Sequence, residues 1–234
     1  MEKSELLIII PAYNEAECIE QVVDNLTENY PQYDYVIIND GSTDDTRKIA
    51  ARRGYNMLDL PVNLGLSGAI KGGMRYANYY GYDYVVQIDG DGQHDPVYIA
   101  DMMREMQESG CDIVIGSRFK TRRKPLTARM FGSLLITAAI RITTGKHIGD
   151  VTSGMRLFNK KMIKQFGYDI HYSPEPDTLA YLLNCGVNIR EVQVEMSERV
   201  TGTSYLTLWN SAWYMMKMMF SILLFQWVRK RKPA

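Results

Sequence analysis

Short apolar runs alternate with helix-like segments along the first half of the chain. The expected strands cover residues 6–10, 35–38, 56–60, 84–88 and 113–115, and the expected helices cover residues 16–28, 45–53, 67–80 and 96–109. This alternation is typical of βαβ units, whose strands are parallel. Ligands of such sheets bind beyond the carboxyl ends of the strands, so the segments after the strands are where a site is expected.

Polar segments follow each of the first four expected strands. They are PAYNE (residues 11–15), NDGSTD (39–44), NLGLSGAIKGG (63–73) and DGDGQHD (89–95). Taken singly, such residues are common in loops, and Glu15 and Asp44 could simply cap the helices that follow. Because each of the four segments follows a strand, we expect all four to lie together at the same rim of the sheet. The sequence has no glycine-rich dinucleotide fingerprint and no phosphate-binding P-loop, so a nucleotide is expected to lie across these loops.

Asp89 and Asp91 stand two residues apart directly after an apolar run. Because side chains alternate in direction along a strand, both carboxylates are expected to point the same way. Like charges this close repel unless a cation lies between them, and an oxygen-only cluster suits Mg²⁺ or Mn²⁺ held partly by substrate phosphates. A solvated turn is the alternative, since Asp and Gly are common turn residues. We favour the metal site.

The composition limits the class of protein. The chain has 234 residues, enough for one large α/β domain. Its 27 basic and 27 acidic residues cancel, so the overall charge gives no reason to expect nucleic-acid binding. Three widely separated cysteines fit neither a disulfide framework nor a zinc site, and the first apolar run is too short for a signal peptide, so cytoplasmic chemistry is expected. His94, His147 and His171 show no ligand spacing and are expected to be structural or surface residues.

Basic residues adjoin an apolar stretch in the middle of the chain. The cations are Arg118, Lys120, Arg122, Arg123, Lys124 and Arg129, and the apolar stretch covers residues 130–142. A lipid phosphate requires both features, cations for its head and an apolar face for its chain. We favour this interpretation over a solvated surface beside an ordinary core segment.

A second apolar segment lies near the C-terminus. Its large side chains recur at helical spacing and are followed by RKRK (229–232): Trp209, Trp213, Met216, Phe220, Leu223 and Trp227. Lys217 and Gln226 interrupt the run, so we predict an amphipathic helix in the plane of the membrane surface rather than a membrane span. A helix packed against the domain or a partner subunit is the alternative. The expected division is a domain over residues 1–204 and a membrane-associating helix and basic tail over residues 205–234.

From about residue 7 to residue 204, the ordered motifs resemble family 2 glycosyltransferases, and within them the polyprenyl-phosphate group typified by dolichyl-phosphate mannose synthase. The resemblance implies an α/β fold of the GT-A type, with a mostly parallel central sheet flanked by helices, a Rossmann-like nucleotide-binding half and C-terminal amphipathic helices. It implies an inverting transfer from a nucleotide sugar to polyprenyl phosphate, such as undecaprenyl phosphate, at the cytoplasmic face of the membrane. A small membrane partner or a homo-oligomer is also expected.

The resemblance also implies roles for individual residues. The nucleotide and donor site would contain Pro11, Tyr13, Glu15, Asp40, Asn63, Gly68, Lys71, Asp89, Gln93, Arg199 and Ser204. The metal would be held by Asp89, Asp91 and Gln93, and the acceptor phosphate by Arg118, Arg129 and Arg156. Catalytic roles would fall to Asp91, Asp150 and Arg199. Asp150 is a candidate base or orienting group, with an ion pair to a neighbouring arginine as the alternative.

The sequence leaves the substrates open. UDP-glucose, UDP-N-acetylglucosamine and GDP-mannose all fit the loops, and SPEPD (173–177) favours a UDP-sugar through its similarity to bacterial relatives. A transferase whose acceptor is a hydroxyl of a glycan or glycolipid is a second hypothesis, and it would need a general base such as Asp150. A non-catalytic subunit that binds nucleotide sugars is a third.

Overall fold

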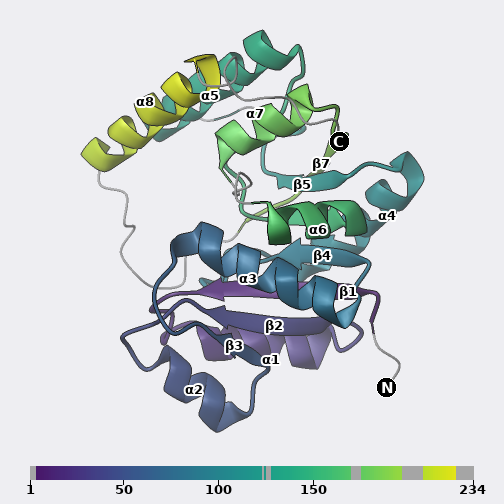
Figure 1. Ribbon diagram of the computed structural model, residues 1–234, viewed down its shortest axis with the longest axis vertical. Coiled ribbons are helices and arrows are strands. Elements are labelled where there is room, and N and C mark those ends of the chain that lie inside the picture. The colour runs from purple at the N-terminus through teal and green to yellow at the C-terminus, as the bar shows by residue number, and fades with distance from the viewer. Residues whose placement is uncertain (1–3, 123, 125–127, 170–174, 197–207, 225–234) are drawn as a thin grey trace.

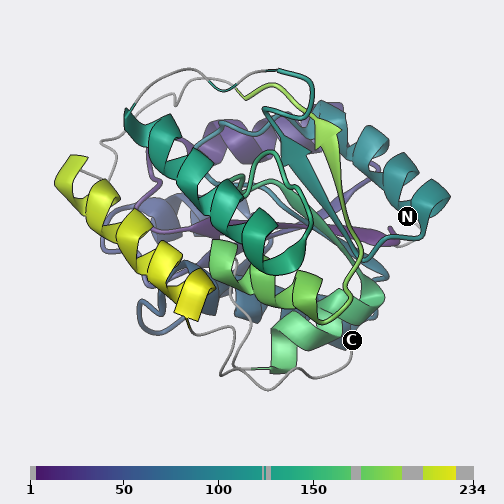
Figure 2. The same cartoon turned by 90° about the horizontal axis from the view of Figure 1, so that it is seen from above.

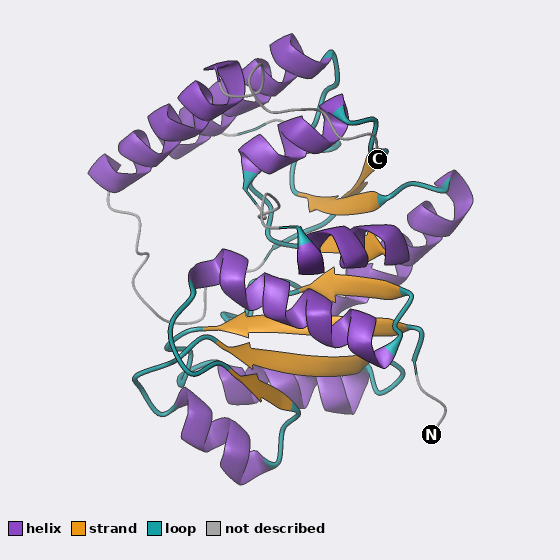
Figure 3. Cartoon of the chain, viewed as in Figure 1, coloured by secondary structure: helices purple, strands orange, loops and turns teal. Residues whose placement is uncertain are grey.

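The structure of the protein is a computed structural model, which describes residues 4–122, 124, 128–169, 175–196 and 208–224. Its strands are β1 (Leu6–Ala12), β2 (Asp34–Asn39), β3 (Met57–Asp59), β4 (Tyr84–Gln87), β5 (Ile113–Ser117), β6 (Arg156–Asn159) and β7 (Ile189–Gln193). Its helices are α1 (Ile19–Asn29), α2 (Thr46–Arg53), α3 (Gly65–Tyr80), the 3₁₀ turn η1 (Pro96–Tyr98), α4 (Ile99–Ser109), α5 (Ala128–Thr144), α6 (Lys160–Tyr168), α7 (Pro176–Asn184) and α8 (Leu208–Leu224). Figures 1 and 3 show helices on both faces of one sheet.

Within the described residues, the strands form a seven-stranded sheet in the order β3-β2-β1-β4-β6-β5-β7. The first four strands along the chain are parallel, as the alternating pattern predicts. β6 runs antiparallel to both of its neighbours, β4 and β5, while β7 is parallel to β5. The carboxyl ends of β1 to β5 and the start of β6 therefore lie at the same rim of the sheet.

Side chains that alternate along β1 bury both faces of the sheet. Leu7 and Ile9 belong to a core shared with α3 and α6, which lie in front of the sheet in Figure 1. Leu6, Ile8 and Ile10 face the opposite core, which includes residues of α1 and α4. Because both faces are covered, β1 is a continuous apolar run, as is typical of a central parallel strand. This rigid centre holds the loops at the rim.

The elements of the first half agree with the pattern in the sequence, with small shifts at helix starts. α1 begins at Ile19 rather than near residue 16, because residues 16–18 form a turn whose amides at Cys18 and Ile19 donate to the carbonyl of Glu15. The helix expected over residues 96–109 begins as η1, where the Asp95 carboxylate accepts a hydrogen bond from the Val97 amide. These are ordinary end effects.

α5, α7 and α8 form a separate helical layer at one end of the sheet, where Figures 1 and 2 show α5 and α8 side by side. Met218 and Ile222 of α8 are buried in the core, and the Ser221 hydroxyl donates to the Asp177 carboxylate at 2.9 Å. Met216, Phe220 and the two final leucines of α8 are exposed. Among the described residues, no helix is long and apolar enough to span a membrane. A helix is present where the sequence predicts one, and it packs against the domain, as the alternative interpretation expected. Its contact with a membrane stays a prediction, and Trp227 and the basic tail lie outside the described residues.

Candidate active site

The turn after β4 carries the two aspartates predicted to bind a metal. One oxygen of Asp89 accepts a hydrogen bond from Gln87 Nε2 at 3.2 Å, and its side chain is 37% exposed. Asp91 is buried, and its Oδ1 accepts a hydrogen bond from the Gln93 amide at 3.1 Å. Gly92, between these two residues, has a φ of 76°, a conformation that favours glycine. Gly92 therefore allows the tight turn that joins Asp91 to Gln93, and a shared metal site of Asp89, Asp91 and Gln93 stays a prediction.

The donor set of this turn fits a hard cation that also binds a substrate. Asp89, Asp91 and Gln93 offer only oxygen ligands, which Mg²⁺ and Mn²⁺ prefer. No group of three or more His, Cys, Asp and Glu side chains is placed to hold a metal alone in the described part of the chain. A cation here would complete its coordination with ligand oxygens, as those of a diphosphate would provide.

Close packing brings the turn over residues 89–93, which we call the metal turn after its predicted ligands, against two other segments. A Cβ on Gly90 would lie 3.3 Å from the Pro11 carbonyl oxygen and 3.5 Å from Glu15 Cγ. A Cβ on Gly154, in the loop before β6, would lie 2.6 Å from Asp89 Oδ2 and 3.0 Å from His94 Cε1. The turn is therefore packed between the PAYNE loop on one side and the segment TSGMR (residues 152–156) on the other.

We expect the substitution Gly154→Ala to weaken metal binding strongly. Its methyl group would overlap Asp89 Oδ2, at a distance that real Cβ atoms do not adopt, so the carboxylate must move. If Asp89 is a metal ligand, as predicted, a change in a residue that orients it should cost about 10- to 100-fold in metal affinity. The apparent Kd for Mn²⁺ in the presence of a nucleoside diphosphate, measured by electron paramagnetic resonance, tests this. Gly167→Ala, on α6, where a Cβ would meet its neighbours only at ordinary contact distances of 3.5 Å or more, is the matched control. An unchanged Kd in Gly154→Ala would contradict the expectation.

The loops after β1, β2 and β3 are tied together at the same rim. Asp40 is buried, its amide donates to the Ala12 carbonyl at 2.9 Å, and its Oδ1 accepts from the Leu64 amide at 2.8 Å. Asn14 has a φ of 58°, and its Oδ1 accepts from the Thr43 amide at 2.8 Å. Of the expected nucleotide residues, Pro11 lies near the end of β1, and Tyr13, Glu15, Asp40 and Asn63 come from connected loops. Gly68 and Lys71 lie in the first two turns of α3.

The side chain of Asp44 binds the start of α2, one residue before the N-cap Asp45, which agrees with the simpler of its two interpretations. Its Oδ1 accepts hydrogen bonds from the Thr46 amide at 3.0 Å and hydroxyl at 2.6 Å, and its Oδ2 accepts from the Ala16 amide at 3.1 Å. Burial opposes ionisation of Asp44, but these hydrogen bonds outweigh it, and the pKa of Asp44 is below its ordinary value. Asp44 thus joins the start of α2 to the loop that precedes α1.

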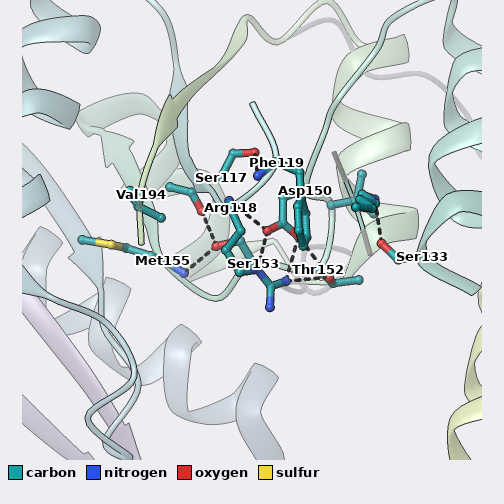
Figure 4. Close-up of polar contacts among 12 residues, drawn as sticks. Ser117, Arg118, Phe119, Ser133, Asp150, Thr152, Ser153, Met155 and Val194 are labelled. Carbon is teal, nitrogen blue, oxygen red and sulfur yellow. Dashed lines mark hydrogen bonds and ion pairs between the residues drawn. The ribbon is translucent and has the colours of Figure 1, made fainter. Parts of the chain in front are cut away.

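Arg118 and Asp150 form a buried ion pair beside the end of β5 (Figure 4). Asp150 is 0% exposed, and its carboxylate accepts from Arg118 Nε at 2.7 Å and Arg118 Nη2 at 2.9 Å. Burial opposes ionisation, but Arg118 outweighs it, so the pKa of Asp150 is lowered. A carboxylate with a low pKa that is held by a guanidinium is a weak general base. This geometry matches the ion-pair alternative for Asp150.

Arg156 lies beneath the same loop. Its side chain is buried, and its Nε and Nη2 donate to the carbonyls of Ser153 at 3.0 Å and Val151 at 3.1 Å. These contacts fix the loop that carries Asp150 and Gly154. To contact the acceptor phosphate, the guanidinium of Arg156 would have to leave these carbonyls. The predicted role of Arg156 in acceptor binding stays a prediction.

Three expected site residues cannot be placed in full. Arg199 and Ser204 lie outside the described residues, and Arg129 lies in the first turn of α5, where its side chain is not described. Their roles stay predictions.

Lys124 is a cation that the sequence marked only as part of a basic run. Its Nζ donates to the hydroxyls of Ser133 at 2.8 Å and Thr137 at 3.3 Å on α5. The ring of Phe119 lies near two cations, with its centroid 5.5 Å from Lys124 Nζ and 5.2 Å from Arg118 Cζ. Burial lowers the pKa of Lys124. Two cations therefore flank an aromatic ring where the rim meets the apolar helix α5.

His94 and Gly154 are further residues of the site that sequence reasoning missed. The Nδ1 atom of His94 accepts a hydrogen bond from the Asp89 amide at 3.0 Å, and its side chain is 3% exposed. His94 is therefore a structural residue, as expected, but one that contacts the metal turn directly. No spacing rule for metal ligands detects a histidine that binds a main-chain amide.

Comparison with known proteins identifies the class. Solved structures of glucosyl-3-phosphoglycerate synthase from Mycobacterium tuberculosis share this fold, with a TM-score of 0.69 at 19% identity over 96% of this chain and 80% of theirs in one case. The expected fold class, an α/β domain of the GT-A type, is thereby confirmed. The family model of glycosyl transferase family 2 matches residues 7–167, and this chain belongs to that family.

Curated relatives point to one group within the family. An undecaprenyl-phosphate mannosyltransferase of Micrococcus luteus is 28% identical over 86% of this chain and 87% of its own. A UDP-N-acetylglucosamine–dolichyl-phosphate N-acetylglucosaminyltransferase of Methanococcus voltae is 29% identical over 81% of this chain and 84% of its own. A polyprenol monophosphomannose synthase of Mycolicibacterium smegmatis is 26% identical over 86% and 80%. The similarity to the polyprenyl-phosphate group that the motifs indicated is confirmed.

Proposed function

We propose that this protein is an inverting glycosyltransferase that moves a sugar from a nucleotide-sugar donor to polyprenyl phosphate, such as undecaprenyl phosphate. The observation that carries the proposal is the packing of the Asp89–Asp91 turn against the PAYNE loop, at the rim where Asp40 is also held. This arrangement suits a nucleoside on one side of the rim and its diphosphate at the acidic turn. Mg²⁺ or Mn²⁺ would be held by Asp89, Asp91 and Gln93 and would neutralise charge on the leaving diphosphate.

The remaining steps fall to residues of the chain itself. Asp40 and the PAYNE loop would bind and orient the nucleoside, and Gly68 and Lys71 would close over the donor. Arg199 would place a second positive charge near the leaving group, where it stabilises the transition state more than the ground state. A phosphate acceptor is already ionised at neutral pH, so its attack needs no strong base. The engagement of Asp150 with Arg118 therefore favours a phosphate acceptor over a sugar hydroxyl.

The acceptor site combines cations with an apolar surface. Arg118 and Lys124 flank Phe119, and Lys124 also binds α5. Leu134 and Leu135 of α5 are each 40% exposed in the same helix. Together with Arg129, these cations would bind the lipid phosphate while the apolar helix accommodates its chain.

The outer faces of α5 and α8 are a candidate membrane surface. Neither helix contains Asp or Glu, and each presents exposed apolar side chains, such as Ile142 on α5 and Phe220 on α8. Arg141 and Lys217 add exposed positive charge. An amphipathic surface of this kind binds the membrane–water interface of membranes that contain anionic lipids. We propose that such a contact would hold the protein at the cytoplasmic face of a membrane, and that a small membrane partner or a second copy of the chain would contribute to it.

The donor is proposed as UDP-glucose or UDP-N-acetylglucosamine, with GDP-mannose also consistent. The Methanococcus voltae relative is named for UDP-N-acetylglucosamine, and other relatives are named for mannose or galacturonate. The neighbouring structure with a TM-score of 0.69 is a complex with Mn²⁺, UDP-glucose and phosphoglyceric acid. These names support a nucleotide-sugar donor and a divalent cation without choosing between sugars.

A panel of labelled nucleotide sugars tests the proposed function. The full chain is incubated with UDP-glucose, UDP-N-acetylglucosamine or GDP-mannose and undecaprenyl phosphate in detergent, with Mn²⁺ or with EDTA. We expect one donor to give a lipid product whose mass equals that of undecaprenyl phosphate plus one sugar residue, and we expect this product only in the presence of the metal. Undecaprenol, which lacks the phosphate, serves as the matched acceptor and should give none. Donor binding without transfer to any acceptor would contradict the proposal and favour a binding subunit.

A further inference from the structure

Glu191, in the middle of the edge strand β7, binds the loop that carries Asp150. Its carboxylate accepts two hydrogen bonds from successive main-chain amides, with Oε2 2.8 Å from the Gly149 nitrogen and Oε1 2.9 Å from the Asp150 nitrogen. A Cβ on Gly149 would lie 3.3 Å from Glu191 Oε1 and 3.2 Å from the Phe119 carbonyl oxygen, so the loop passes very close to both groups. The carboxylate of Glu191 therefore fixes the main chain at Asp150.

Gln193, two residues further along β7, binds the loop after β5. Its Oε1 accepts hydrogen bonds from the Thr121 amide at 2.8 Å and the Thr121 hydroxyl at 2.9 Å, and its Nε2 donates to the Arg118 carbonyl at 3.0 Å. Alternate residues of a strand point to the same side of the sheet, so Glu191 and Gln193 act from the same side. One strand thus holds the loop before β6 and the loop after β5 together.

The two loops meet at the guanidinium of Arg118 (Figure 4). The Asp150 carboxylate accepts from Nε at 2.7 Å and from Nη2 at 2.9 Å, and Nη2 also donates to the Thr152 hydroxyl at 3.2 Å. Nη1 makes no hydrogen bond to the residues that the structure describes, and the Arg118 side chain is 27% exposed. Nη1 is therefore the part of the guanidinium that can donate to an anion such as a phosphate.

We propose that Glu191 and Gln193 are positioning residues for Arg118, so that Nη1 is held in place to bind the acceptor phosphate. Glu191 acts through Asp150 on the guanidinium, and Gln193 acts on the main chain of Arg118. A guanidinium that is fixed before the phosphate arrives loses less entropy on binding. The role of the phosphate rests on the proposed function, whereas the contacts that hold Arg118 do not.

The substitution Glu191→Gln tests this role, because it keeps the size of the side chain and replaces one accepting oxygen by an NH₂ group that cannot accept. We expect the KM for undecaprenyl phosphate to rise by about 10- to 100-fold with kcat much less changed, since the lost interaction binds the acceptor. The Kd of the nucleotide-sugar donor with Mn²⁺ should stay at the parental value. Glu108→Gln, at an exposed glutamate of α4, is the matched control. A lower unfolding temperature with an unchanged KM would show that Glu191 is purely structural and would overturn the inference.

Gln193→Met approaches the same arginine from its main chain. It removes the hydrogen bonds of Gln193 to Thr121 and to Arg118, and we expect it to raise the same KM without changing donor binding. This variant decides the matter if Glu191→Gln does not fold.

The NMR signal of the Arg118 Nε–H group tests the geometry independently of activity. Its proton exchanges slowly with water while it is hydrogen-bonded to Asp150, and the signal is assigned by its loss in Arg118→Lys. In the full chain without substrates, we expect faster exchange of this proton, and of the Gly149 and Asp150 amides, in Glu191→Gln than in the control. Faster exchange of the two amides with an unchanged Nε–H signal would overturn the inference, because Glu191 would then hold the loop without positioning Arg118. If the parent transfers no sugar to a lipid phosphate, the proposed function fails, and the Nε–H signal still decides whether Glu191 positions the guanidinium.

Discussion

Replacing Asp89 and Asp91 together by alanine is expected to lower the rate of sugar transfer by about three orders of magnitude. On the proposed function, these carboxylates would hold a cation worth several kcal/mol of stabilisation to the leaving diphosphate, and about 4 kcal/mol corresponds to a factor of about 10³. The fold should survive, because Asp89 is partly exposed and the substitution removes two like charges from one turn. Initial rates of lipid product, measured at saturating donor, check this.

The double substitution Asp45→Ala and Asp101→Ala is the matched control. Both residues are exposed aspartates in surface ion pairs, with Lys48 and Arg104, and such pairs contribute about 0–1 kcal/mol to stability. The control should transfer sugar at the parental rate. A double variant at Asp89 and Asp91 that is as active as this control would contradict the metal site.

Arg118→Met is expected to destabilise the folded protein by about 3–5 kcal/mol, because it leaves the carboxylate of Asp150 buried without its partner. Chemical denaturation of the two proteins at neutral pH measures this difference. Arg122→Met removes an ion pair with Glu195 in which both side chains are exposed, so it should change the free energy of unfolding by about 1 kcal/mol or less.

The pH dependence of this destabilisation has a definite sign. In the parent, the pKa of Asp150 is lowered, so the ion pair stabilises the fold above the pKa of the unfolded chain, and this contribution is lost as the pH falls through the lower pKa of the folded state. In Arg118→Met, Asp150 stays buried without the guanidinium, so its pKa should rise. As the pH falls, Asp150 is therefore protonated in the variant before it is protonated in the parent, and the cost of burying its charge disappears. The difference in stability should therefore narrow as the pH is lowered from about 7 to about 4. A difference that stays constant with pH would show that Asp150 is not its cause.

The sequence predicts the first half of the fold because its signals are local. Each of the first four expected strands is four or five residues long and is followed by a polar segment, and each becomes a parallel strand near the expected residues. The placement of β6 between β4 and β5 could not be predicted this way. It depends on pairing over a long sequence separation, such as Tyr84 with Asn159, and on the reversal of chain direction before Arg156. No local pattern encodes either feature.

The residues of the candidate site also divide into those that local sequence signals predict and those that only the fold reveals. Asp89 and Asp91 were predicted because their spacing and their position after a strand are visible in the sequence. His94 and Gly154 were not assigned to the site, because one binds a main-chain amide and the other only provides space for a carboxylate from a distant segment. Asp150 and Arg118 are 32 residues apart, so only the fold reveals that they form one ion pair. Contacts of this kind depend on tertiary packing and leave no periodic signal.

The most direct test of the metal site is a crystal of the full chain grown with Mn²⁺ and a nucleoside diphosphate, recorded at a wavelength where manganese scatters anomalously. We predict an anomalous peak at the turn after β4, with oxygens of Asp89, Asp91 and a phosphate at about 2.0–2.3 Å. A bound nucleotide without a peak at this turn, or a peak that contacts neither aspartate, would contradict the account.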